Sequence, residues 1–285
     1  MNVIISKDVS FCKGVSLAID KMIKSIDWGK KHELPVYSLG QLIHNERALE
    51  CLKKQGVTII EEDELANVKP GIIVLRAHGV KETVLRRLFF LGFIIVDATC
   101  PIVIREQDLI KKADSKYHIV VIGKKGHPEA IFLYSVETCH SRTMITCLED
   151  VKKINTDKPL FIVIQSTFPQ TKANAIYEEI ERIKANDQEI VIANALCNST
   201  RLRRQHIKDL VKRVDCMVII GGKNSSNTDG LRLYALSFKK PVFLINSKDE
   251  IPLEVYDYES VGIATGTSTP QFIIDEIVDT LKGER

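Results

Sequence analysis

The chain has 285 residues, of which 45% are hydrophobic and 27% are charged, and its formal net charge is +3. This is an ordinary globular composition, long enough for two or three small domains or for one large one. No dense run of Lys and Arg is interleaved with aromatic residues, so the sequence does not indicate a nucleic-acid partner.

The first residues, MNVIISKDVSFCKG, lack the basic leader and apolar core of a signal peptide. No apolar run approaches the length of a membrane span. We therefore expect a cytoplasmic protein with no membrane partner. Seven cysteines in that compartment are expected to stay reduced, and none of them belongs to a CxxC pair.

The predicted elements alternate between helices and strands. After Cys12, apolar residues recur at 15, 18, 19, 22, 23 and 26, offsets that place them on one helical face. Asn45 is expected to cap a second helix that ends at Gly56. Short β-rich runs follow at 72–75, 93–96, 119–122, 161–164, 190–193, 217–220, 242–245 and 261–264. Most are continuously apolar, which favours an α/β fold with small, mainly parallel sheets.

Three kinds of strand ending each occur three times, in the same order: a cysteine turn, a Gly-led polar turn and a small polar turn. The three rounds are Cys12, His44 and His78; Cys100, His127 and Thr167; and Cys197, Ser225 and Ser268. We infer three βα domains, residues 1–96, 97–193 and 194–285, with the C-terminal segment packing against the first. Because ligands bind at the carboxyl ends of strands in open α/β sheets, a pseudo-threefold arrangement would point all nine turns into one central cavity.

The three repeated cysteines, Cys12, Cys100 and Cys197, are the predicted metal ligands. Soft thiolates favour zinc or an iron–sulfur cluster. A cubane cluster held by three cysteines keeps one iron open for a substrate oxygen, unlike an electron relay with four. The remaining cysteines are expected to be small buried side chains: Cys51, Cys139, Cys147 and Cys216.

The other turns are typical of an anion pocket. Gly-led turns and helix N-termini offer backbone N–H groups to phosphate, and histidines and hydroxyls add donors. The candidate donors are His44, His78, His127, Ser225, Ser226, Asn227 and Ser268. Glu129, in GHPE, is the candidate general acid, and Thr167, in QSTF, is expected to position substrate or relay its proton. No P-loop or GxGxxG motif indicates a nucleotide.

Seven motifs in order resemble the family of 4-hydroxy-3-methylbut-2-enyl diphosphate reductases, the last enzymes of the methylerythritol phosphate route to isoprenoid precursors. They are FCKGVSLAI, LIHN, RAHGV, DATCP, GHPE, QSTF and GGKNSSNT, and the likeness runs from residue 11 to about residue 270. The resemblance implies a [4Fe–4S] cluster on Cys12, Cys100 and Cys197. It also implies that the histidines, serines and Asn227 named above hold the diphosphate.

The resemblance further implies that Glu129 and Thr167 deliver a proton while two electrons remove the substrate hydroxyl as water. Isopentenyl and dimethylallyl diphosphate would be the products. An external ferredoxin or flavodoxin would supply the electrons, because the chain has no flavin or nicotinamide motif. A quinolinate-synthase-like lyase, a non-enzymatic redox sensor and a zinc hydrolase are the alternatives. The first would not bind a diphosphate, the second needs a partner surface, and no HExxH motif supports the third.

The chain departs from the family pattern in three places. CNSTRLRRQ stands where C-x-A-T-x-x-R-Q is usual, so Ser199 replaces alanine and Gln205 is displaced by one. After NSSNT, Asp229 and Gly230 precede the expected basic residue and leucine, and in GTSTP Thr267 replaces alanine. The first two changes fall at helix starts of the third domain. We expect them to affect how this domain docks and how it closes over the substrate.

Overall fold

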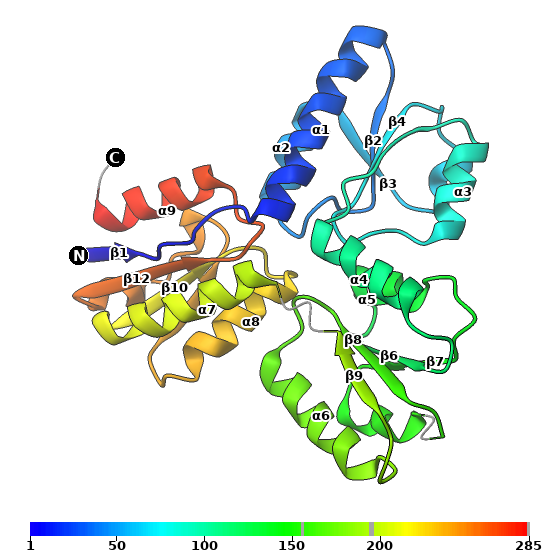
Figure 1. Ribbon diagram of the computed structural model, residues 1–285. Helices are drawn as coiled ribbons and strands as arrows, with labels where there is room; N and C mark the ends of the chain where they lie inside the picture. Colours follow the sequence, from blue (N-terminus) through cyan, green and yellow to red (C-terminus); the bar gives the residue numbers. More distant parts are fainter. Residues whose placement is uncertain (155–156, 194–196, 284–285) are drawn as a thin grey trace. The chain divides into compact units, whose positions relative to one another are not determined.

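The computed structural model describes residues 1–154, 157–193 and 197–283 (Figure 1). Within these residues the chain forms three four-stranded sheets, and the described strand pairs are parallel. This confirms the predicted α/β class with small parallel sheets. Two compact units are present: residues 1–19, 41–57 and 197–285 form the first, and residues 20–40 and 58–196 form the second.

The first unit contains one sheet with the strand order β1-β12-β10-β11. Its strands are β1 (Asn2–Ile5), β10 (Cys216–Ile220), β11 (Val242–Ile245) and β12 (Ser260–Thr265). The helices of this unit are α2 (Glu46–Lys54), α7 (Asn198–Leu210), α8 (Ser226–Leu236) and α9 (Gln271–Lys282). The N-terminal strand lies at the sheet edge and pairs with the last strand of the chain, with Ile4 opposite Gly262.

The second unit contains two sheets, with the orders β3-β2-β4-β5 and β7-β6-β8-β9. The first is built from β2 (Val36–Leu39), β3 (Val57–Ile60), β4 (Ile72–Leu75) and β5 (Ile94–Val96). The second is built from β6 (His118–Ile122), β7 (Arg142–Ile145), β8 (Leu160–Ile164) and β9 (Ile190–Ala193). The helices are α3 (Glu82–Phe90), α4 (Pro101–Lys112), α5 (Pro128–Tyr134) and α6 (Gln170–Ile183), while α1 (Lys13–His32) begins in the first unit.

Short 3₁₀ segments complete the described structure: Glu64–Ala66, Leu148–Lys153, Val211–Arg213, Lys248–Glu250 and Leu253–Asp257. All eight predicted strands are present, and each observed end lies within one residue of the predicted end. The central strands β4, β6, β8 and β10 are buried along their whole length, as continuous apolar runs in a parallel sheet require. None of the described helices combines the length and apolar character that a membrane crossing demands.

The two predicted helix patterns are confirmed with one difference. Ala18 and Met22 of α1 are fully buried, but Ile23 is 42% exposed, so the apolar face is narrower than the sequence spacing suggests. The α2 helix is capped as predicted, because the Asn45 side chain accepts from the N–H of Ala48 at 3.0 Å. It ends before Gly56, whose φ of +100° favours glycine.

The cysteines outside the repeat differ in burial. Cys216 is fully buried in β10, as predicted, whereas Cys51 is half-buried on α2. Cys139 and Cys147 are exposed, so the prediction of burial is wrong for these two. Both lie beside the edge strand β7, which leaves one side of the segment open to solvent.

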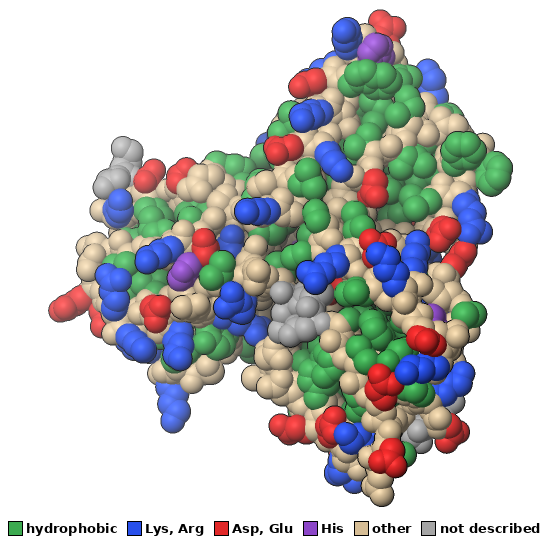
Figure 2. Space-filling view, in the orientation of Figure 1, with side chains coloured by type: hydrophobic (Ala, Val, Ile, Leu, Met, Phe, Trp, Pro, Cys, Tyr) green, Lys and Arg blue, Asp and Glu red, His purple; other side chains and the backbone are tan. Residues whose placement is uncertain are grey.

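Figure 2 shows that Lys and Arg side chains gather over α7 and α8 on one face of the first unit.

Candidate functional site

The three repeated cysteines each lie directly before a helix. Cys100 and Cys197 occupy the N-cap positions of α4 and α7, and Cys12 precedes the first residue of α1. The expectation that Cys12 directly follows a strand is wrong, since β1 ends at Ile5 and residues 6–11 form a loop. Residues 194–196, before Cys197, lie outside the described residues. A helix N-terminus stabilises a thiolate, which is the form that binds metal.

The first unit brings Cys12 and Cys197 together. Burial raises the pKa of Cys12, and the charge of Cys197 raises it further, while N–H groups of Val15 and Gly14 act in the opposite direction. Two neighbouring thiols that resist joint ionisation are stabilised as thiolates by a bound cation. Their soft sulfur donors, partly buried at helix starts, therefore fit an iron–sulfur cluster.

Cys100 belongs to the second unit, where it is tied to the RAHGV turn. Its backbone N–H donates to the carbonyl of Ala77 at 2.9 Å, so Cys100 is anchored beside the residue that precedes His78. The Cys100 side chain is half-buried. The second unit thus holds one predicted cluster ligand next to one predicted diphosphate ligand.

The start of α8 in the first unit carries unsatisfied donors. Ser225 is its N-cap, and its hydroxyl accepts from the N–H of Thr228 at 3.3 Å. Asn227 is buried, and its carbonyl oxygen accepts from the Thr200 hydroxyl at 3.1 Å. The buried Nδ2 of Asn227 and Oγ of Ser226 make no hydrogen bond among the described residues. Buried donors without a partner at a helix N-terminus are what an anion-binding site offers before its ligand arrives.

Two further turns meet in the first unit. The Ser268 hydroxyl donates to the main-chain carbonyl of His44 at 3.0 Å. A Cβ on Gly222 would lie 2.7 Å from the same carbonyl, so the glycine permits this approach. On the other side, a Cβ on Gly266 would lie 2.1 Å from the Thr228 hydroxyl. The His44, Ser225 and Ser268 turns are therefore packed against one another.

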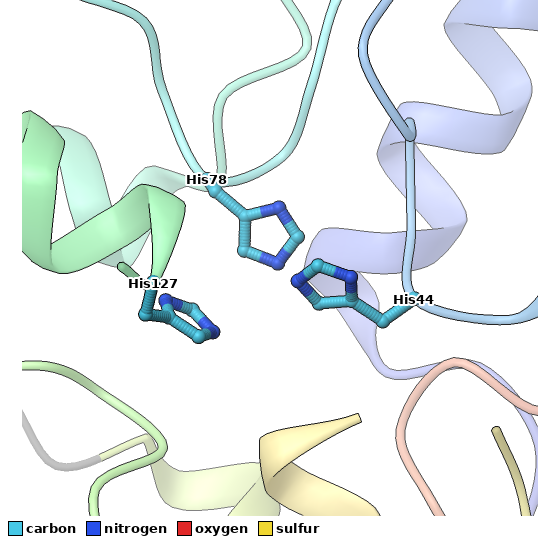
Figure 3. A group of neighbouring side chains, drawn as sticks. All are labelled: His44, His78 and His127. Carbon is cyan, nitrogen blue, oxygen red and sulfur yellow. The ribbon is translucent and has the colours of Figure 1, made fainter. Parts of the chain in front are cut away.

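The second unit pairs His78 with His127. Their ring centroids are 5.4 Å apart and the rings are nearly perpendicular, at 86° (Figure 3). Gly79 makes the approach possible, because its φ is +80° and a Cβ there would lie 2.7 Å from the Phe132 ring of α5. His127 caps α5, and its Nδ1 accepts from the N–H of Glu129 at 3.2 Å. A neutral His127 therefore carries its proton on Nε2, which is a donor.

Glu129 is buried in the second unit, with 2% of its surface exposed. Burial raises the pKa of Glu129 to about 7, against the opposing effect of hydrogen bonds from Ser166. The Ser166 N–H donates to one carboxylate oxygen and its hydroxyl lies 3.0 Å from the other. A carboxyl group that still holds a proton near neutral pH is suited to general acid catalysis.

Thr167 is held by the neighbouring Gln165. The Gln165 side-chain amide donates to the Thr167 hydroxyl at 2.8 Å, and its oxygen accepts from the N–H of Lys124 at 2.9 Å. Gln165 is fully buried, so it fixes the QSTF turn to the loop that leads to His127. The sequence reasoning named Thr167 and missed Gln165 and Ser166, although all three belong to one motif.

Gly230, one of the departures from the family pattern, lies beside a contact between α7 and α8. Arg204 of α7 lies over the Tyr234 ring of α8, 5.8 Å from its centroid. A Cβ on Gly230 would lie 3.8 Å from the Arg204 guanidinium, so the glycine leaves this side chain room. Asp229 pairs with Arg232 on the same helix at 2.8 Å. Arg204 and Tyr234 thus join α7 to α8, and Gly230 leaves room for this contact.

The whole chain matches one protein family. The profile described as LytB protein matches residues 3–282. A 4-hydroxy-3-methylbut-2-enyl diphosphate reductase of Alkaliphilus oremlandii is 34% identical over 288 residues, covering 99% of both chains. The enzyme of the same name from Dictyoglomus turgidum is 37% identical over 285 residues, covering 99% of this chain and 96% of its own.

Solved structures give the same result. The E-1-hydroxy-2-methyl-but-2-enyl-4-diphosphate reductase of Plasmodium falciparum superposes with a TM-score of 0.88 at 26% identity, covering 98% of this chain and 87% of the other. A second structure, of the (E)-4-hydroxy-3-methyl-but-2-enyl diphosphate reductase that ends the non-mevalonate pathway, gives a TM-score of 0.72 at 30% identity. That match covers 99% of this chain and all of the other.

Proposed function

Because the chain belongs to the LytB family of 4-hydroxy-3-methylbut-2-enyl diphosphate reductases, we propose that it converts this diphosphate to isopentenyl and dimethylallyl diphosphate. The reaction consumes two electrons and two protons and releases the hydroxyl group as water. The observation that carries the proposal is the buried Glu129 carboxyl, which burial keeps protonated up to about pH 7. It adjoins His127, a candidate diphosphate ligand.

We propose that Cys12, Cys100 and Cys197 hold a [4Fe–4S] cluster. In support, each cysteine lies at a helix start and the first unit places two of them within electrostatic reach of each other. When bound, such a cluster supplies electrons one at a time and, with three protein ligands, offers a Lewis-acidic iron. The proposed repeats at 1–96, 97–193 and 194–285 would each contribute one ligand.

The proposed diphosphate ligands belong to the polar turns described above. Ser226 and Asn227 offer buried donors at the N-terminus of α8, whose dipole also favours an anion. Ser225 and Ser268 shape that turn, and His44, His78 and His127 complete the set. The Nε2 proton of neutral His127 donates to a phosphate oxygen, since its Nδ1 is occupied by the Glu129 N–H.

Glu129 supplies the proton and Thr167 relays or orients it. Protonation of the departing hydroxyl needs an acid that keeps its proton at neutral pH and releases it on demand. Ser166 holds both carboxylate oxygens through two donors, and these become stronger when Glu129 is ionised. Gln165 keeps the Thr167 hydroxyl at the same turn.

An external one-electron carrier of the ferredoxin or flavodoxin type is the proposed donor. The basic surface over α7 and α8 (Figure 2) suits a small acidic protein. The reaction places the chain at the last step of the methylerythritol phosphate route, in the cytoplasm, where reducing conditions preserve free thiols.

The test is anaerobic iron and sulfide analysis with EPR of the reduced protein, with and without the hydroxylated diphosphate. We expect about four iron and four sulfide per chain and a signal that changes when the diphosphate binds. Zinc in place of iron would contradict the proposed cluster. An EPR signal that does not change when the diphosphate is added would contradict the proposed substrate. Product analysis by mass spectrometry after single turnover then checks for both isomers.

A further inference from the structure

A buried arginine, Arg203, connects the turns that carry Cys12 and Ser268. It belongs to α7, which begins after Cys197, and only 4% of its surface is exposed. One terminal nitrogen, Nη1, donates to the carbonyl and hydroxyl of Thr265, each at 2.7 Å, and to the Gly266 carbonyl at 3.2 Å. The other, Nη2, donates to the Ser10 carbonyl at 2.5 Å.

The Cys12 loop depends on these contacts. Ser10 has a φ of +68°, a left-handed conformation that is unfavourable for a residue other than glycine. Its N–H donates to the Thr265 hydroxyl at 3.1 Å, so both of its backbone polar groups are held by the Arg203–Thr265 pair. Two residues later, the Cys12 N–H donates to the Thr267 carbonyl at 3.0 Å. Removal of Arg203 would release Ser10 from its strained conformation, and the position of Cys12 depends on that conformation.

No carboxylate among the described residues forms an ion pair with Arg203. Each of its hydrogen-bond acceptors in the described structure is a neutral oxygen, and its Nε is buried without a partner there. The carboxylate of Asp8 also acts on Arg203 electrostatically, but it pairs with His206 at 2.9 Å. The guanidinium is bonded to Ser10, two residues before Cys12, and its own helix begins directly after Cys197. The thiolates of Cys12 and Cys197 are therefore the anions that we expect beside this buried cation.

We propose that Arg203 is a positioning residue for the proposed cluster: it fixes the Cys12 turn and supplies a permanent buried positive charge beside two of the thiolates. The inference rests on the proposed function. Each electron that enters the cluster adds a negative charge, and a nearby cation in a low-dielectric site stabilises that charge. Arg203 thus raises the reduction potential and helps to retain the cluster.

The test compares Arg203→Met, Arg203→Gln and Arg203→Lys with Arg201→Gln, an exposed arginine on the same helix. Iron and sulfide content are measured anaerobically, and the midpoint potential is measured by EPR-monitored redox titration. We expect the neutral variants to lose iron and to shift the potential to more negative values. Arg203→Lys keeps the charge with fewer donors, so its potential stays near that of the parent while its iron content falls. Arg201→Gln matches the parent, because solvent screens its charge.

If Arg203→Met does not accumulate as folded protein, the Lys and Gln variants decide the question. Equal potentials in those two variants would overturn the electrostatic role, and parental iron content in both would overturn the structural role. A parent chain without iron would instead overturn the proposed function. A parent with iron and activity whose Arg203 variants behave identically overturns this inference alone.

Discussion

The backbone N–H and the hydroxyl of Ser166 both donate to the carboxylate of Glu129. These donors favour the ionised form, but burial outweighs them, and the pKa of Glu129 rises to about 7. Burial therefore keeps a proton on this acid near neutral pH, and the Ser166 donors stabilise the carboxylate that remains once the proton has left. That balance is the basis for the first two predictions.

Glu129→Gln is expected to retain iron and substrate affinity and to lose turnover by about 10²- to 10⁴-fold, the usual contribution of a general acid. Glutamine has nearly the same shape but has no acidic proton to transfer. The measurement is single-turnover product formation with a chemically reduced enzyme. Glu137→Gln, an exposed carboxylate that pairs with Arg86, is the control and should turn over normally. Normal turnover in Glu129→Gln as well would remove Glu129 from the mechanism.

Glu129 also makes stability depend on pH. Its pKa is raised on folding from the ordinary value of 4.5 to about 7, so the folded chain binds more protons than the unfolded chain between these values. This contribution is complete below about pH 4.5 and is lost as pH rises through about 7, a change on the order of 3 kcal/mol. Urea unfolding from pH 5 to 8 should show the decline in the parent chain and a flatter profile in Glu129→Gln. Parallel profiles would contradict the buried, protonated carboxyl.

Cys100→Ser is expected to lose the cluster or to retain a partial one, because an alcohol is a poor ligand for soft iron. The matched control is Cys139→Ser, which changes an exposed cysteine outside the repeat. Iron content and the EPR spectrum distinguish the two variants. A complete cluster with full activity in Cys100→Ser would refute its assignment as a ligand.

His127→Asn is expected to weaken diphosphate binding while α5 stays intact. The asparagine oxygen can replace Nδ1 as the acceptor for the Glu129 N–H, so the helix keeps its cap. The Nε2 donor is lost, and one hydrogen bond to a charged ligand contributes about 1.5–3 kcal/mol. Calorimetric titration with the diphosphate measures the change, with the exposed His32→Asn as control. Equal affinity in both variants would place the phosphate elsewhere.

Gly79→Ala is expected to separate His78 from His127 and to destabilise the second unit by about 1–3 kcal/mol, through a positive φ and overpacking. The new Cβ would lie 2.7 Å from the Phe132 ring. Gly92 has the same φ of +80°, but no atom lies within 4 Å of its added Cβ, so Gly92→Ala isolates the backbone effect. Urea unfolding should show the larger loss for Gly79→Ala, and equal losses would mean that the contact with Phe132 is unimportant.

The sequence was most informative where apolar residues follow one another without interruption. The runs at 72–75, 190–193 and 242–245 coincide with β4, β9 and β11, because continuous apolar stretches bounded by turns have few alternative folds. Strands β1, β2, β3 and β7 were not predicted individually. β7 contains Arg142 and Thr143, which interrupt the apolar run.

Within the candidate site, the sequence identified residue types but not their supports. Cys12, Glu129 and Thr167 stand out because their motifs recur or are distinctive. Arg203 does not stand out, because the sequence alone does not distinguish a buried arginine bonded to carbonyls from the other basic residues of the same helix. Its role depends on contacts 62 and 193 residues away along the chain, and no local pattern encodes such distances.

The pairing of β1 with β12 determines when the first unit can fold during synthesis of the chain. The first strand has β12 as its described neighbour, so it stays unpaired until residues 260–265 have emerged from the ribosome. The second unit draws only on residues 20–40 and 58–196 and can fold during translation. Cys12 and Cys197, which the first unit brings together, become neighbours only when synthesis is nearly complete. If this pair binds the proposed cluster, iron is loaded onto it only after translation.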